Sequence, residues 1–383
     1  MTDFGDGALD RFSYTYTGGT YTFNPAGNVA GNAQYITGKG MTSGFVGTRN
    51  DLIIATGGSS ETGPTNLARY ALNGSLIGNI TVANNGFTGG GNGSAQTGTA
   101  NHTFAGINGM AISDDARYLF VTESTSATNG IISKIDLATS QIVSQVSFAG
   151  AHDVTVLSDG SIYAAALNST SASSRGMWHF SSALVKDATA AIPYSTSTNP
   201  PPTYTGIDHV TFMKVVGNNL YVADSDTNAA GAIAVYSLTG SGSIATPAIV
   251  NVYTPATPSL DNFYGAAVGQ DGNLYIADIG TGKANGNNTF TGSTTYVNGV
   301  YSFNTSSPSN TVSTAIAGWN NSTGTTSNGL DSPIYISFDA NFSGTNDQGT
   351  PEPGSIALAC CLLTVGVIVR RRKRNRTNCI TRN

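Results

Sequence analysis

Two neighbouring pairs of a histidine and an aspartate are the residues of this chain best suited to chemistry. His152-Asp153 and Asp208-His209 each stand just before or at the start of an apolar segment, and Asn108, Asn262 and Asp331 hold corresponding places elsewhere. Carboxylate, amide and imidazole groups gathered around one axis can hold Ca²⁺ or another divalent ion. They predict a metal-dependent hydrolase or a calcium-stabilised channel. The alternative is that they cap strand ends and bind water.

Other catalytic signals are absent from the sequence or weak. The chain has no G-x-S-x-G, no P-loop and no H-E-x-x-H motif. Residues 224–228, Asp-Ser-Asp-Thr-Asn, begin like a calcium loop, but the glycine and the final acid of that loop are missing, so a solvated loop is expected. His102 and His179 stand alone, and His179, beside Trp178, is expected to be structural.

Composition restricts the class of protein. Charged residues make up 10% of the 383 residues, and glycine accounts for 47. This composition excludes a mainly helical protein, while a hydrophobic fraction of 39% excludes a wholly disordered one. Residues 1–349 carry 10 basic and 21 acidic side chains, a charge of −11. We therefore expect no nucleic-acid partner.

An internal repeat organises residues 1–341. In each copy an apolar segment runs into a turn with Asp, Gly or Asn, and a short strand of the LYVAD type follows. Copies occur at residues 44–58, 109–124, 152–166, 210–226 and 265–280. Third strands are expected at 66–72, 130–137, 176–182, 231–238 and 298–305, and fourth strands at 75–82 and 141–148. Each copy therefore predicts a four-stranded antiparallel meander.

The meanders have to pack against each other, because one sheet cannot bury both faces alone. Asp159-Gly160, Gly217-Asn218 and Asp271-Gly272 provide the positive φ values that hairpin turns need. We predict an all-β fold, a β-propeller of six blades, with seven blades as the alternative and a two-sheet sandwich as the rival fold. The recurrence of Glu123, Asp224 and Asp278 at the end of the second strand is expected to serve a turn or a contact between blades.

The two ends of the repeat region complement each other. Residues 332–339 resemble an inner strand with no second strand after it, whereas residues 1–23 resemble a second, a third and a fourth strand. Met1-Thr2-Asp3 aligns with Val222-Ala223-Asp224. We therefore expect both termini to close one blade. We also expect the recorded start to lie within a strand, downstream of a signal peptide.

The strands LYVAD (220–224) and LYIAD (274–278) resemble the NHL and SMP-30/gluconolactonase-like propellers and the wider YVTN family. In SMP-30-like lactonases a metal held by Glu, Asn and Asp polarises a lactone carbonyl. The resemblance thus implies a lactonase or esterase activity. This chain departs from the pattern, since no Glu occupies a matching inner-strand position.

The C-terminal segment has three parts. Pro351-Glu352-Pro353 is extended, residues 354–369 are an uncharged apolar run, and Arg370, Arg371 and Arg372 begin a basic cluster. A helix of this run is about 24 Å long, and flanking arginines can reach the membrane interface, so a single transmembrane helix with a cytoplasmic C-terminus is predicted. The alternative is a buried C-terminal helix with a solvated tail.

This order of parts resembles the PEP-CTERM sorting signal, in which an exosortase recognises the Pro-Glu-Pro box. The resemblance implies an exosortase substrate that is exported, anchored in the inner membrane, and then associated with the cell surface or extracellular matrix. The domains are then a propeller at 1–341, a linker at 342–350, and the sorting signal at 351–376 with a tail to Asn383. All three cysteines, Cys360, Cys361 and Cys379, lie in the C-terminal segment.

From these features we expect an exported propeller that binds polysaccharide or a surface protein. Low charge, many Asn and Thr and 17 Tyr suit a carbohydrate-facing surface. The alternatives are a metal-dependent lactonase, esterase or lyase at the channel mouth and a structural envelope component without a discrete ligand.

Overall fold

The computed structural model describes residues 2–3, 10–17, 20–28, 41–46, 49–56, 65–71, 75–166, 174–194, 207, 210–224, 232–239, 244–253, 263–269, 273–278, 297–303, 312–320, 325–326 and 333–335. Every regular element in these ranges is a β-strand, which confirms the predicted all-β class. The predicted sorting segment lies outside these ranges, and within them no helix is long and apolar enough to cross a membrane.

Five antiparallel sheets are built from strands that follow each other along the chain. The first contains β4 (Met41–Val46), β5 (Arg49–Thr56), β6 (Asn66–Ala71) and β7 (Leu76–Ile80). The second contains β8 (Ile107–Ile112), β9 (Tyr118–Glu123), β10 (Ile131–Asp136) and β11 (Gln141–Ser147). The third contains β12 (Ala151–Val156), β13 (Ile162–Ala166) and β14 (Gly176–Phe180).

The fourth sheet contains β15 (Val210–Val216), β16 (Asn219–Asp224), β17 (Ala232–Leu238) and β18 (Ile244–Tyr253). The fifth contains β19 (Phe263–Val268), β20 (Leu274–Asp278), β21 (Val297–Phe303), β22 (Val312–Asn320) and β23 (Thr325–Thr326). The predicted second and third strands are therefore confirmed in all five sheets. The predicted number of four strands holds for the first, second and fourth sheets, whereas the third contains three described strands and the fifth contains five. Positive φ angles at Gly160 and Gly217 confirm two of the predicted hairpin turns.

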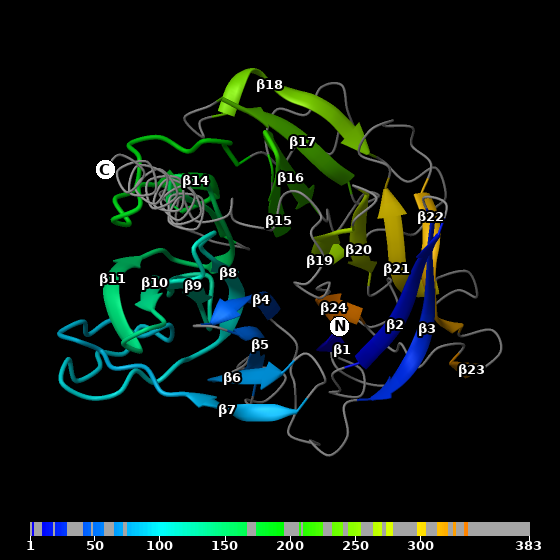
Figure 1. Ribbon diagram of the computed structural model, residues 1–383. Helices are drawn as coiled ribbons and strands as arrows, with labels where there is room; N and C mark the ends of the chain where they lie inside the picture. The colour runs from blue at the N-terminus through cyan, green and yellow to red at the C-terminus, as the bar shows by residue number, and fades with distance from the viewer. Residues whose placement is uncertain are drawn as a thin grey trace, which may run out of the picture.

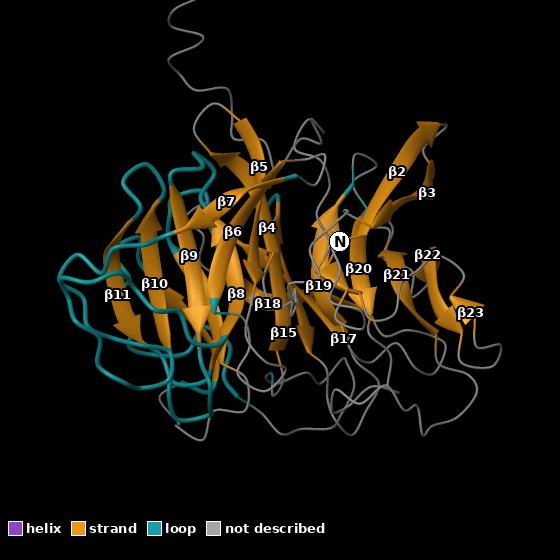
Figure 2. Cartoon of the chain, turned by 90° about the horizontal axis from the view of Figure 1, so that it is seen from below, coloured by secondary structure: helices purple, strands orange, loops and turns teal. Residues whose placement is uncertain are grey.

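The sheets stand around a common centre, with the first strand of each sheet innermost (Figure 1). Inner strands contact one another in chain order, from β4 to β8, β12, β15 and β19. In the perpendicular view the sheets stand side by side with their strands running along the central axis (Figure 2). This arrangement of repeated meanders is that of a β-propeller.

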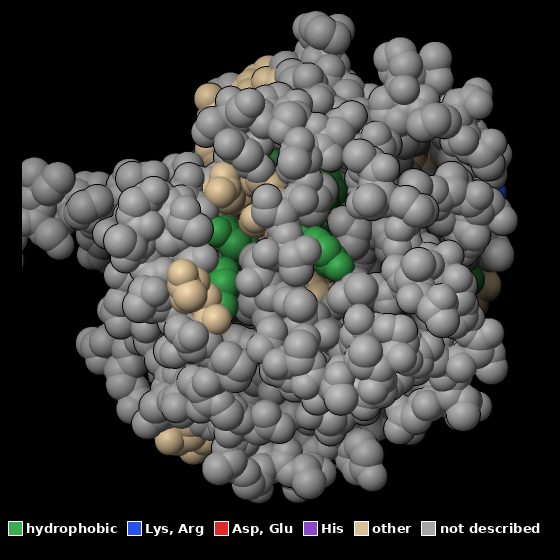
Figure 3. All heavy atoms as spheres, turned by 90° about the vertical axis from the view of Figure 1, so that its right-hand side faces the viewer, with side chains coloured by type: hydrophobic (Ala, Val, Ile, Leu, Met, Phe, Trp, Pro, Cys, Tyr) green, Lys and Arg blue, Asp and Glu red, His purple; other side chains and the backbone are tan. Residues whose placement is uncertain are grey.

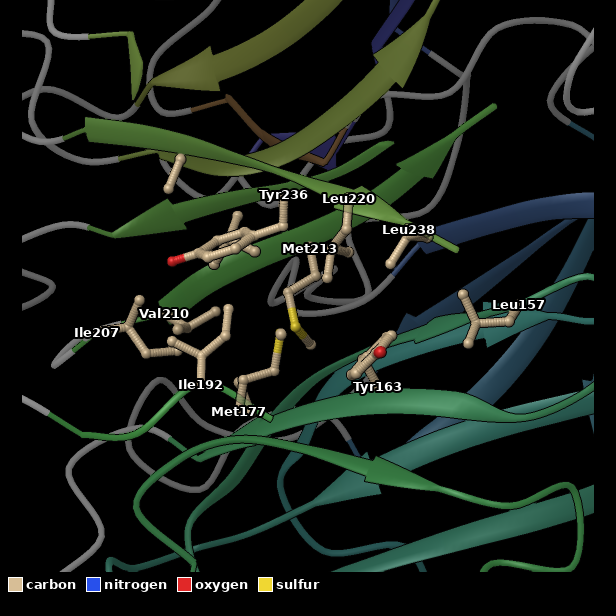
Figure 4. Close-up of a cluster of buried hydrophobic side chains, with 13 residues drawn as sticks. Leu157, Tyr163, Met177, Ile192, Ile207, Val210, Met213, Leu220, Tyr236 and Leu238 are labelled. Carbon is tan, nitrogen blue, oxygen red and sulfur yellow. The ribbon is translucent and has the colours of Figure 1, made fainter. Parts of the chain in front are cut away.

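Apolar side chains between neighbouring sheets hold the propeller together. Figure 4 shows Tyr163 and Met177 of the third sheet pointing toward Met213, Leu220 and Tyr236 of the fourth. Similar clusters lie between the first and second sheets, the second and third, and the fourth and fifth. On the face drawn in Figure 3, the described side chains that reach the surface are mostly hydrophobic or neutral and lie in small separate areas.

The third sheet replaces its fourth strand with an irregular segment. Met177 and Ile192 exchange two backbone hydrogen bonds of 3.0 and 3.2 Å, and the Asp187 N–H donates to the His179 carbonyl at 3.0 Å. These bonds satisfy the outer edge of β14 without a continuous strand.

Strands near the two ends of the repeat region form one ladder, which is the part of the predicted closure that the structure describes. β1 (Thr2–Asp3) pairs antiparallel with β24 (Pro333–Tyr335). β2 (Asp10–Thr17) and β3 (Thr20–Asn28) form a separate two-stranded ladder, with no ladder between β1 and β2 among the described residues. β3 packs against the fifth sheet, where the rings of Phe23 and Tyr275 contact edge to face with 5.8 Å between their centroids.

Candidate functional site

Five of the strands share an irregularity near the point where each begins: one extra residue, a β-bulge, interrupts the ladder to the neighbouring strand. In β8, β12, β15 and β19 these residues are Asn108, His152, Thr211 and Tyr264, and in β24 it is Ile334. The inner strand of the first sheet, β4, pairs with β5 without a bulge. A bulge bends a strand and re-aims a side chain, so these five strands share one special position at their beginning.

Four of these bulges face an acidic residue that ends the second strand. Glu123 stands opposite Ile107, Asp224 opposite Val210, Asp278 opposite Phe263 and Asp3 opposite Pro333. The third sheet departs from this pattern, with Ala166 opposite Ala151. The recurring acids thus mark a structural position of the repeat.

Asn108, His152 and Asp153, three of the predicted site residues, lie together where β8 meets β12. The Asn108 side-chain amide donates to the carbonyls of Ser124 and Ala151, both at 3.0 Å. The Thr122 hydroxyl donates to the His152 carbonyl at 2.8 Å. These bonds tie the second and third sheets together at their inner edge.

Asp153 is buried between three inner strands. The Met213 N–H of β15 donates to its Oδ2, while β8 approaches from the other side at Gly109. A Cβ added at Gly109 would lie 2.6 Å from Asp153 Oδ1, so only glycine allows this close approach. Burial raises the pKa of the Asp153 carboxyl to about 7, although the N–H groups of Val154 and Met213 and the charge of Lys214 act in the opposite direction.

The other predicted site residues, Asp208, His209, Asn262 and Asp331, lie outside the described residues. In the fourth sheet the position equivalent to His152 belongs to Thr211, which the sequence analysis did not select. Its hydroxyl is buried and has no hydrogen-bond partner among the described residues. The apolar-polar step Val210-Thr211, which parallels Ile107-Asn108 and Ala151-His152, was the signal that would have identified it.

The buried Asp153 carboxyl, with its raised pKa, is the group of this site whose chemistry the structure describes most fully. In the described part of the chain no three His, Cys, Asp or Glu side chains are grouped to hold a metal ion. A carboxyl with a pKa near neutrality can exchange a proton at physiological pH. Asp153 is only 4% exposed, so its carboxyl has little direct contact with solvent.

A second buried polar cluster lies where a long loop meets the second sheet. His102 Nε2 lies 2.7 Å from Glu123 Oε1, and both side chains are fully buried. Asn84 donates to the carbonyls of Thr97 and Asn101, so its oxygen faces His102 and accepts from Nδ1–H at 2.9 Å. The other Glu123 oxygen accepts from the Ala105 N–H at 2.9 Å.

The prediction that His102 and His179 stand alone is wrong for both. His102 pairs with Glu123, and His179 Nδ1 lies 3.0 Å from Asp187 Oδ2 at the surface. The partners are 21 and 8 residues away in sequence, which is why spacing did not reveal them.

The loop between β7 and β8 forms one wall of a pocket. The Gly89 N–H donates to Gln145 Oε1 of β11 at 2.9 Å, and the Asn129 amide donates to the Asn92 carbonyl at 3.2 Å. Between this loop and the second sheet lies an open pocket of about 440 Å³. Its walls are residues between 88 and 95, residues 128–131, Ser147, Ala149 and Ser174.

No family model matches this chain, and no curated protein matches its sequence. Among solved structures it is similar to the gluconolactonase of Xanthomonas campestris, with 13% identity, coverage of 78% of this chain and 79% of that chain, and a TM-score of 0.44.

It is also similar to hydrazine synthase of Kuenenia stuttgartiensis, with 11% identity, 70% and 63% coverage and a TM-score of 0.43. A third likeness is to the WD40 β-propeller domain of Doa1, with 10% identity, 63% and 62% coverage and a TM-score of 0.36. The chain thus spans less than two thirds of the length of these last two structures. Likenesses of this size carry no argument about activity.

Proposed function

We propose that this protein is an exported β-propeller that binds a ligand at the cell surface or in the extracellular matrix. The observation that carries the proposal is the pocket beside the second sheet. Its walls are formed by an inserted loop that is anchored to the sheet by a buried hydrogen-bonded network. Its described lining carries hydroxyl groups, the Asn129 amide and exposed backbone, which can all form hydrogen bonds with a ligand.

The proposed propeller has six blades, the sixth shared by both ends of the chain. Support comes from the β1–β24 ladder, in which Asp3 faces the first residue of a bulge as Asp224 and Asp278 do in complete blades. In this proposal β24, β1, β2 and β3 are the four strands of that blade. Closure of this kind removes the free sheet edges at the two ends of the chain.

The proposed route to the surface rests on the C-terminal sequence. Pro351, Glu352 and Pro353 are the sorting box, residues 354–369 the temporary inner-membrane anchor, and Arg370, Arg371 and Arg372 its cytoplasmic end. An exosortase is the proposed processing partner. A Pro351→Ala/Pro353→Ala variant, produced in an exosortase-containing host, is expected to stay in the membrane fraction, with Pro193→Ala as the control. Equal release of both variants would contradict this route.

Binding is tested with the purified full chain in detergent. Co-sedimentation with insoluble extracellular polysaccharide, without turnover of lactone or ester substrates, is the expected result. Turnover without binding would contradict the proposal.

Asp153 supports one alternative, a hydrolase at the inner edge of the strands. Its pKa of about 7 suits a general acid or base, and the buried Thr211 hydroxyl lies on the neighbouring inner strand. Predicted site residues outside the described ranges, Asp208 and His209 among them, would then complete a Ca²⁺ site. This alternative requires lactone or ester turnover that is lost in Asp153→Ala and Asp208→Ala.

A further inference from the structure

The pocket beside the second sheet offers a ligand hydroxyl groups, amides and backbone but no charge. Its hydroxyl-bearing residues are Thr88, Ser94, Thr128, Ser147 and Ser174, and Asn129 adds an amide. Among the residues that the structure describes, no Lys, Arg, Asp, Glu or His belongs to its lining. Hydroxyl groups both donate and accept hydrogen bonds, so such a wall suits a ligand that does the same at many points.

Apolar contacts in the pocket are small and flat. The apolar side chains of the described lining are Ala95, Ala149 and Ile131, of which Ile131 is only 4% exposed, and glycine backbone contributes the rest. Among the described residues no aromatic ring lines the pocket, so a planar aromatic ligand finds no stacking partner among them. An ionised ligand would lose hydration without gaining a counter-charge.

The walls are held in place before any ligand arrives. Gln145 accepts from the Gly89 N–H, and its own amide donates to Ser133 Oγ at 3.1 Å. Asn92 holds the tip of the loop, because its side chain accepts from the Ser94 N–H at 3.0 Å while its carbonyl accepts from Asn129. A preformed wall reduces the ordering cost of binding.

From these features we infer that the pocket binds a neutral mono- or disaccharide unit. The inference rests on the proposed binding function and gives its ligand class. A volume of about 440 Å³ falls within the range of small-molecule sites, roughly 300–1,000 Å³. Several ring hydroxyls can pair with serine, threonine and backbone groups, while one C–H face of the sugar rests on an alanine methyl group such as that of Ala149.

The test uses the full chain in detergent and saturation-transfer NMR with galactose, glucose, cellobiose and N-acetylglucosamine. Galacturonate and glucuronate serve as anionic counterparts that differ from the first two sugars by one carboxylate. We expect signals from one or more neutral sugars, and at least a tenfold weaker response from the matched uronate.

Ser147→Trp fills the pocket from the exposed end of β11 and should abolish these signals. Thr139→Trp places the same bulk on the same hairpin at its opposite end, and should bind like the wild type. Circular dichroism and thermal melting verify that both variants are folded; should Ser147→Trp not fold, Ala149→Leu takes its place.

Sugar binding that survives in Ser147→Trp would overturn the inference, since the site would lie elsewhere. A preference for uronates would overturn it as well. Both results leave the proposed binding function intact. Co-sedimentation with polysaccharide but no signal from any mono- or disaccharide would likewise overturn the inference and leave that function intact. If the protein bound neither polysaccharide nor sugars but did turn over lactones, the proposed function itself would be rejected.

Discussion

Asp153 carries its carboxyl in surroundings that disfavour a charge. Burial between β8, β12 and β15 raises its pKa to about 7, compared with about 3.9 in an unfolded chain. The native state therefore binds its proton more tightly than the unfolded state between about pH 4 and pH 7. This difference makes the residue a probe of how the inner strands pack.

We predict that the free energy of unfolding falls as the pH rises through this window. Asp153 alone contributes on the order of 4 kcal/mol to this fall, since each pKa unit corresponds to about 1.36 kcal/mol. Asp153→Asn keeps the shape of the protonated acid and should remove this contribution. The stability of this variant relative to the wild type should therefore be higher at pH 8 than at pH 5. Chemical denaturation at several pH values measures both effects.

The exposed acid Asp187 provides the control, and Asp187→Asn should retain the wild-type slope. An identical pH dependence in Asp153→Asn and the wild type would mean that the Asp153 carboxyl is already ionised in the folded protein.

At the scale of elements, the loop between β7 and β8 depends on one buried glutamate. Glu123 is the last residue of β9. Its Oε1 lies 2.7 Å from His102 Nε2, and its Oε2 accepts a hydrogen bond from the Ala105 N–H. Gly91 approaches so closely that an added Cβ would lie 2.5 Å from the Glu123 Cβ. The strand end therefore shapes the loop, and the loop in turn forms a wall of the pocket.

We predict a strong coupling between His102 and Glu123 in a double-mutant cycle. Glu123→Ala leaves His102 and the Ala105 N–H buried without their acceptor, so it should cost about 3–5 kcal/mol of stability. The double variant with His102→Ala should be considerably more stable than the sum of the single changes predicts. Urea denaturation of the four proteins gives the coupling energy.

The pair Arg117 and Asp136 in the same sheet serves for comparison. Arg117 is 57% exposed, so solvent screening should make its coupling to Asp136 much weaker than that of the buried pair, despite a distance of 3.1 Å. Similar couplings for the two pairs would contradict the role assigned to the buried cluster.

At the scale of the whole molecule, the chain ends form one ladder. Thr2 is paired with Tyr335 and Asp3 with Pro333, although more than 300 residues separate them. Directly opposed residues of antiparallel strands lie about 4.5–5.5 Å apart at Cα, which is within the range of a disulfide bond.

We predict that Thr2→Cys/Tyr335→Cys forms a disulfide, in a background where Cys360, Cys361 and Cys379 are replaced by serine. A loop of this length should stabilise the folded protein by about 6 kcal/mol in the chain-entropy model. A mobility shift on a non-reducing gel and a melting temperature that drops on reduction are the expected observations. Thr2→Cys/Thr139→Cys is the control and should remain reduced. Failure of the first pair to form a disulfide would contradict closure by both ends.

Local patterning was sufficient to predict the strands and their grouping. The repeated turn and LYVAD-type strand predicted β9, β13, β16 and β20, and the alignment of Met1-Thr2-Asp3 with Val222-Ala223-Asp224 predicted the β1–β24 pair. These features depend on alternation, turn chemistry and repetition, which are properties of short segments.

The polar contacts could not be predicted from short segments, because they depend on tertiary packing. His102 meets Glu123 because an inserted loop folds back on β9, and Asp153 acquires its raised pKa because β8 and β15 exclude water from both sides. Thr211 takes the bulge position because the ladder of β15 begins at Val210. Burial and long-range contact depend on neighbours distant in sequence, so the chemical state of these side chains is decided only when the blades pack together.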